Sequence, residues 1–214
     1  MPREHDGEMT SEQRTTYAGA SYWFSGVVDR VGRRWDEPGL GEWSVRDLVG
    51  HTSRALLTVE TYLSAAREAP DTPLDLVSAA DYLVASRVGL ADPAAVAQRG
   101  RDAGAALGPD PAAAVHEIVD RVLALVTEQS GDAMVATPVG GMLLDAYLPG
   151  RVFELAVHGA DLAHALGVTM QPPEPAVASA LELGGHLAAR SGTAGEVLRA
   201  LTGRQGLRAG FTVL

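Results

Sequence analysis

The chain has 214 residues, a formal net charge of −10 and 46% hydrophobic side chains, which is typical of one folded domain with an adequate core. It contains no cysteine and no lysine, which excludes disulfides, thiolate metal sites, a cysteine nucleophile and Schiff-base chemistry on a protein amine. The acidic charge, a pI near 5.0 and the lack of a basic run argue against nucleic acid as a partner.

The spacing of apolar residues predicts a chain dominated by helices. In chain order, helices are expected at about residues 17–35, 45–63, 74–88, 93–107, 111–129, 151–166 and 175–190. The clearest start is Ser44, which can form a capping box with Asp47, while Trp43 is placed to pack against Leu48. Residues 133–147 mix β-forming side chains with a Gly-Gly pair, which indicates a small hairpin or a lip.

These elements fit a single domain spanning residues 1–214. Residues 1–12 are expected to be flexible, and residues 168–214 to form a C-terminal helix and an irregular tail. Because helices dominate and no repeat is visible, the pattern favours an all-α four-helix bundle with additional short helices. The possible hairpin would precede the last bundle helix. Bundles of this kind place metal sites on facing helices.

Three residues form a candidate metal site. Glu154 and His158 stand four residues apart on one predicted helix and therefore share a face. His51 lies in the apolar stripe of another helix and is expected to point inward. A His-Glu-His set leaves one coordination position free for exchange, which is typical of catalytic zinc. For His51 alone, a core histidine hydrogen-bonded to a neighbour is the alternative interpretation.

Arg151, Glu154, His158 and Asp161 form one narrow polar stripe on an otherwise apolar helix. A solvated surface face explains the spacing equally well, but the narrowness of the stripe favours a lined cavity. Asp161 can accept the second imidazole N–H of a ligand histidine, or it is a surface carboxylate. Arg151 can hold an anionic group of a substrate, or it is a surface arginine at a helix end.

Two segments carry a family resemblance. Residues 43–51 (Trp-Ser-Val-Arg-Asp-Leu-Val-Gly-His) and 151–161 (Arg-x-x-Glu-x-x-x-His-x-x-Asp) resemble the paired motifs of the maleylpyruvate isomerase N-terminal domain family. This family is part of the DinB-like superfamily of metal-binding four-helix bundles, and the resemblance covers about residues 11–167. It implies a divalent metal, usually zinc, and mycothiol or a related small thiol as cosubstrate. The implied metal ligands are His51, Glu154 and His158.

The resemblance favours a metal-dependent transferase or isomerase in which a small thiol attacks an electrophilic small molecule. A free thiol with a pKa near 8.5 is only a few per cent thiolate at neutral pH, whereas coordination to zinc deprotonates it. The resemblance also makes Arg99 and Arg101 candidates for holding the thiol. Two alternatives stay open: a hydrolase that uses zinc-activated water, and a non-catalytic module that binds a ligand or a metal.

The expected partners are therefore a small electrophile and a small thiol, with neither nucleic acid nor a membrane. No segment approaches 18 uninterrupted apolar residues, and residues 1–16 lack the apolar segment of a signal peptide. We expect a cytoplasmic protein that is a monomer or a homodimer.

Overall fold

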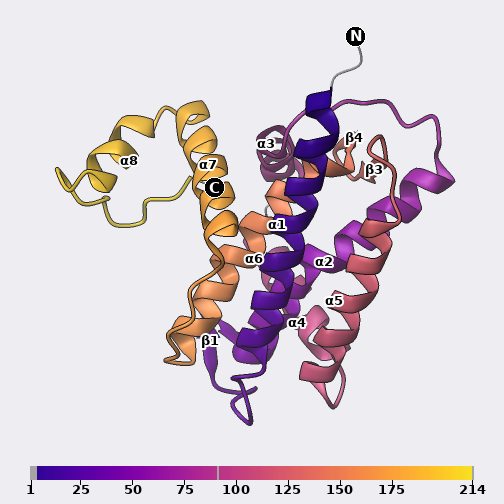
Figure 1. Cartoon of the computed structure of the whole chain (residues 1–214). Helices are drawn as coiled ribbons and strands as arrows, with labels where there is room; N and C mark the ends of the chain where they lie inside the picture. Colours follow the sequence, from indigo (N-terminus) through magenta and orange to yellow (C-terminus); the bar gives the residue numbers. More distant parts are fainter. Residues whose placement is uncertain (1–3, 91, 214) are drawn as a thin grey trace.

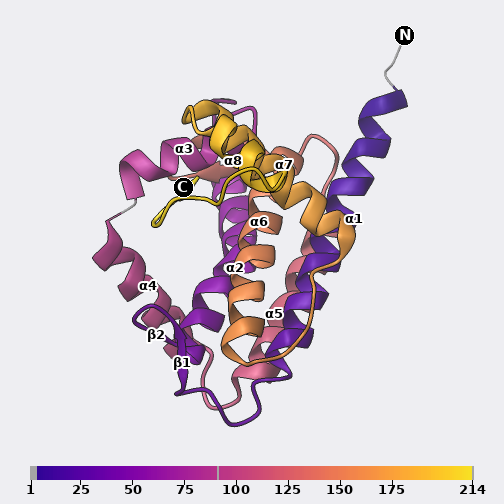
Figure 2. The ribbon, with the colours of Figure 1, turned by 90° about the vertical axis from the view of Figure 1, so that its left-hand side faces the viewer.

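The computed structural model describes residues 4–90 and 92–213 (Figure 1, Figure 2). This part of the chain contains eight helices and two antiparallel hairpins. The helices are α1 (Glu4–Val28), α2 (Val45–Glu68), α3 (Ala79–Leu90), α4 (Pro93–Ala106), α5 (Pro111–Thr127), α6 (Leu144–Ala165), α7 (Glu174–Arg190) and α8 (Ala194–Leu201). The hairpins pair β1 (Pro38–Leu40) with β2 (Trp43–Ser44) and β3 (Met134–Thr137) with β4 (Gly140–Leu143).

Four of the helices form a bundle around a common core. Helices α1 and α2 each pack against both α5 and α6, so the four helices enclose apolar side chains from all sides (Figure 1). The core includes one nearly inaccessible residue from each of them: Phe24, Leu56, Val119 and Leu155. The expected all-α bundle is thereby confirmed, and it places neighbouring faces of α2 and α6 against each other.

The remaining helices cover the outside of the bundle. Helix α4 lies along α2, and the two approach so closely that a Cβ on Gly50 would be 2.1 Å from the backbone nitrogen of Gly104, so only glycine fits there. Helices α3 and α7 pack against α6, and α8 lies on the outer side of α7, away from the bundle (Figure 1). None of the helices in the described residues is long and apolar enough to cross a bilayer.

Local side-chain chemistry accounts for several helix starts. The expected capping box forms at α2: the backbone N–H of Asp47 donates to Ser44 Oγ at 3.2 Å, and that of Ser44 donates to Asp47 Oδ2 at 3.0 Å. At α4 and α5 the side chains of Asp92 and Asp110 accept from the backbone N–H of Ala95 and Ala113, without a reciprocal bond, and each aspartate is followed by a proline in the first turn. These caps agree with the starts expected at residues 93 and 111.

Helices α1, α3 and α6 have bounds different from those expected. Helix α1 spans Glu4–Val28 instead of residues 17–35. Its first turns are polar, so the apolar spacing did not indicate the early start. Beyond its end, Gly32 takes a positive φ of 61°, which is incompatible with a continuing helix. Helix α3 begins at Ala79 rather than near residue 74. Leu74 instead bridges to Gly141 of β4, so the segment before α3 joins the hairpin. The flexibility expected for residues 1–12 stays a prediction.

Three further features were not expected from the sequence. Helix α6 begins at Leu144, so Pro149 lies inside it rather than before it. The β1–β2 hairpin is too short to produce a strand pattern. Helix α8 occupies part of the segment expected to be an irregular tail. The hairpin β3–β4, by contrast, forms where the sequence indicated one.

Candidate metal centre

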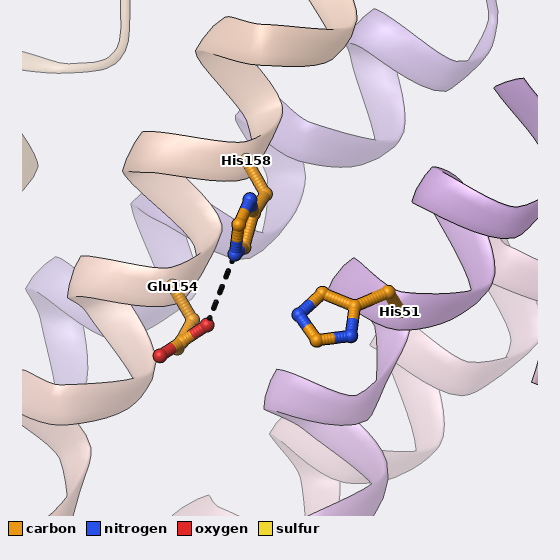
Figure 3. A group of neighbouring side chains, drawn as sticks. All are labelled: His51, Glu154 and His158. Carbon is orange, nitrogen blue, oxygen red and sulfur yellow. Dashed lines mark ion pairs between the residues drawn. The ribbon is translucent and has the colours of Figure 1, made fainter. Parts of the chain in front are cut away.

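The structure brings His51, Glu154 and His158 together between α2 and α6. Figure 3 shows His51 projecting from α2 toward the two side chains of α6. One possible ligand atom from each residue lies within 4.8 Å of those of the other two. Glu154 and His158 converge because they are one helical turn apart, and His51 meets them because α2 and α6 are neighbours in the bundle.

The stripe on α6 is a connected chain of polar groups. His158 Nε2 lies 3.3 Å from Glu154 Oε2, and His158 Nδ1 lies 3.2 Å from Asp161 Oδ2. The side chains of Glu154, His158 and Asp161 are 21%, 20% and 33% exposed, so this stripe is not an open solvated face. With Nε2 on a metal, Nδ1–H would donate to Asp161, which would fix the orientation of the ring.

The His51 ring lies between two other aromatic rings. Its centroid is 4.4 Å from that of Trp43 and 4.9 Å from that of His158. Trp43 is held in turn by α4, where its Nε1–H donates to the carbonyl of Ala97 at 3.0 Å and its ring lies against Gly100. His51 Nδ1 is buried and has no hydrogen-bond partner among the described residues. The alternative of a core histidine satisfied by a neighbour therefore does not describe this ring.

Burial and neighbouring charges set the protonation of the three residues. Burial alone would raise the pKa of Glu154, but the hydrogen bond from His158 and the charge of Arg151 lower it to about 2. Burial would lower the pKa of His158, but its bonds to Asp161 and Glu154 raise it to about 9. Burial, reinforced by the charge of His158, lowers the pKa of His51 to about 4. Without metal, the site at neutral pH holds a carboxylate, an imidazolium and a neutral imidazole.

Zinc binding to the metal-free protein is expected to release about one proton per metal near neutral pH. His158 must lose its proton to become a ligand, whereas Glu154 is already ionised and His51 already neutral. The apparent zinc affinity should therefore rise about tenfold per pH unit until the pH exceeds the pKa of His158. Calorimetry in two buffers with different ionisation enthalpies measures the proton count. An affinity that does not change between about pH 6 and 8 would contradict this protonation scheme.

Arg151 lies in the interior of the bundle. It is 7% exposed, and its guanidinium carbon is 4.7 Å from the ring centroid of Tyr147 and 5.3 Å from that of Tyr82. Its Nε is buried without a hydrogen-bond partner in the part of the chain that the structure describes. Because α6 starts two turns earlier than expected, Arg151 does not lie at a helix end on the surface. Its proposed contact with a substrate anion stays a prediction.

The two arginines considered for thiol binding lie in different surroundings. Arg99 lines a cleft of about 400 Å³ between α2 and α4. Arg101 is exposed, and its guanidinium donates to Gln98 on the same helix. The cleft also contains Arg54, which the sequence pattern did not mark. Arg54 lies one turn after His51 on α2, and this spacing is the signal that could have identified it.

Comparison with known proteins identifies one family. The family model described as the mycothiol maleylpyruvate isomerase N-terminal domain matches residues 25–163, more than half of the chain. The matched segment contains all three candidate ligands and ends within α6, so α7, α8 and the tail lie beyond it. No curated protein and no solved structure matches the chain.

Proposed function

The chain belongs to the mycothiol maleylpyruvate isomerase N-terminal domain family, and from this premise we propose that it is a metal-dependent enzyme using a small thiol of the mycothiol type. The thiol attacks an electrophilic small molecule, and the outcome is transfer of the thiol or isomerisation of the substrate. The observation that carries this proposal is the convergence of His51, Glu154 and His158 in a chain without cysteine.

The donor set suits a divalent metal, and zinc is the proposed ion. Two imidazoles and one carboxylate are ligands typical of catalytic zinc, with a further position left for an exchangeable group. When bound, the metal lowers the pKa of a coordinated thiol, so that the thiolate predominates at neutral pH. Asp161 holds the His158 ring in place, and the contact with His158 together with the positive charge of Arg151 lowers the pKa of Glu154 and keeps it ionised.

The cleft between α2 and α4 is the proposed place for the thiol and the electrophile. Its walls include α2 residues that lie one to three turns beyond His51, so a ligand there can reach toward the metal centre. Arg54 and Arg99 provide positive charge, and Thr58 and Tyr62 provide hydroxyl groups. Arg99 is therefore the preferred candidate for thiol binding. Arg101 is not one of the described residues that line this cleft.

We also propose where this enzyme is located, its oligomeric state and its partners. We place it in the cytoplasm, as a monomer or a homodimer, with small molecules as its partners. The acidic net charge of −10 supports the exclusion of nucleic acid.

Direct coordination of a thiol tests the proposal without knowledge of the substrate. Protein loaded with Co²⁺ in place of zinc is titrated with N-acetylcysteine. A near-ultraviolet sulfur-to-cobalt charge-transfer band is expected, and it should saturate at about one thiol per metal because three protein ligands leave a position for it. N-acetylserine, which has a hydroxyl in place of the thiol, is the matched control and should produce no band. A cobalt spectrum that N-acetylcysteine leaves unchanged would remove the thiol-enzyme proposal.

A further inference from the structure

A second cavity lies beside a different face of α6 from the one that carries the metal ligands. It has a volume of about 680 Å³ and is enclosed by α6, α7, α8 and tail residues 207–213. Helix α6 contributes Phe153, Ala156, Val157 and Ala160, which are turned by roughly a third of a turn from the polar stripe. None of the candidate metal ligands lines this cavity.

The lining of this cavity is almost entirely apolar. Among the described residues that line it, Gln171 is the only one with a polar side chain and none is charged, although charged residues make up 21% of the chain. The volume lies within the range of about 300–1,000 Å³ that is usual for small-molecule pockets. A charged molecule entering it would lose hydration without meeting a counter-charge, whereas an apolar molecule would be stabilised by burial.

Two adjacent glycines in the middle of α7 keep the cavity wide. A Cβ added at Gly185 would meet nothing within 4 Å, and one at Gly184 would meet only the Phe153 ring, at 3.9 Å. Gly159 in α6 is different, because a Cβ there would lie 2.3 Å from the Trp23 ring and would prevent helix packing. Glycine weakens a helix relative to alanine. Close packing explains Gly159, whereas at Gly184 and Gly185 the absence of a side chain leaves volume in the cavity.

The tail closes one side of the cavity through contacts at the surface. Arg208 Nε pairs with Glu196 Oε2 of α8 at 3.3 Å, and the guanidinium lies 5.6 Å from the ring centroid of Phe211. Phe211 and Leu207 both line the cavity. The exposed lining is rich in leucine: Leu181, Leu198 and Leu201 are 61%, 61% and 69% exposed. A ligand can therefore enter from solvent and still be surrounded by four segments.

We propose that this cavity is a binding site for an uncharged apolar small molecule, with a hydrocarbon or aromatic body and at most one polar group. The uncharged lining is complementary to such a ligand and disfavours polar thiols and carboxylates. Enclosure by four segments favours a small molecule over the flat surface of a second protein. The proposal is independent of the metal centre, because the two sites share only α6.

A neutral fluorescent probe tests this proposal on the full chain. N-phenyl-1-naphthylamine, whose fluorescence rises in apolar surroundings, is expected to bind saturably at about one molecule per chain, with or without zinc. 1-Decanol should displace it, and decanoate, which has the same chain length but a charged carboxylate, should be at least about tenfold weaker. Absence of saturable binding, or equal displacement by the two competitors, would overturn the proposal.

Matched variants locate the bound probe. Gly184→Leu should lower the probe affinity at least about tenfold by filling the cavity. Gly195→Leu, the same substitution in α8 at a position that does not line the cavity, should leave it unchanged. Ala180→Asp, which adds a charge with a small change in volume, should also lower the affinity, and circular dichroism verifies that each variant is folded.

Two results from these variants would contradict the assignment. One is an affinity that both Gly184→Leu and Ala180→Asp leave unchanged. The other is a dimer that must dissociate, as measured by sedimentation, before the probe binds. In that case a second copy of the chain would be the occupant.

Discussion

Replacing His158 with alanine is expected to lower zinc affinity by roughly a thousandfold while leaving a folded helical protein. If a zinc-binding free energy of about 12 kcal/mol is shared by three ligands, the loss of one costs about 4 kcal/mol, which corresponds to this factor. Helix content should persist because the bundle core is apolar, and the His158 side chain is 20% exposed at its edge. Competition with a chromophoric chelator measures the affinity, and circular dichroism measures the helix content.

Two further variants make this experiment specific. His116→Ala removes an exposed histidine that pairs with Asp29 away from the site, and it should leave zinc affinity unchanged. Glu154→Ala should lower zinc affinity by a similar factor and also destabilise the fold, because buried Arg151 loses the attraction of a nearby acidic group. A large loss of helix in His158→Ala would identify the metal as structural. Unchanged affinity in that variant would remove the site assignment.

Turnover by the zinc-loaded protein is expected to fall to the uncatalysed rate when no thiol is added. The chain has no cysteine or lysine to act as a nucleophile, and in the proposed function the nucleophile is the thiol of a cosubstrate. A free thiol with a pKa near 8.5 is about 3% ionised at neutral pH. Coordination to a metal would deprotonate the thiol and so raise the thiolate fraction roughly thirtyfold. Holding the thiolate beside the electrophile in the cleft adds a further, larger acceleration.

The measurement uses 1-chloro-2,4-dinitrobenzene and related electrophiles, with and without mycothiol, and mass spectrometry detects conjugates or isomerised product. Metal-free protein and His158→Ala serve as controls and should show only the uncatalysed rate. Equal turnover without a thiol would support a hydrolase that uses activated water instead. Tight ligand binding without any turnover would support a non-catalytic binding module.

Much of the secondary structure follows from local sequence alone. The capping box at Ser44, the proline starts of α4 and α5 and the hairpin before α6 depend on residues within a few positions of one another. The pairing of Glu154 with His158 and of His158 with Asp161 is equally local, because the helical repeat determines which residues share a face. The sequence by itself therefore determined the all-α class, the α6 half of the candidate metal site and, through its two motifs, the family.

Tertiary structure decided which helices meet and what covers them. Whether His51 faces Glu154 depends on the packing of α2 against α6, about a hundred residues away in the chain. The burial of Arg151 under two tyrosine rings depends on α3 and on the early start of α6. Arg54 and Arg99 share a cleft only because two glycines let α2 and α4 approach closely. Periodicity reports the faces of a single helix, whereas the position of each face relative to other elements is determined by side-chain packing between segments distant in sequence.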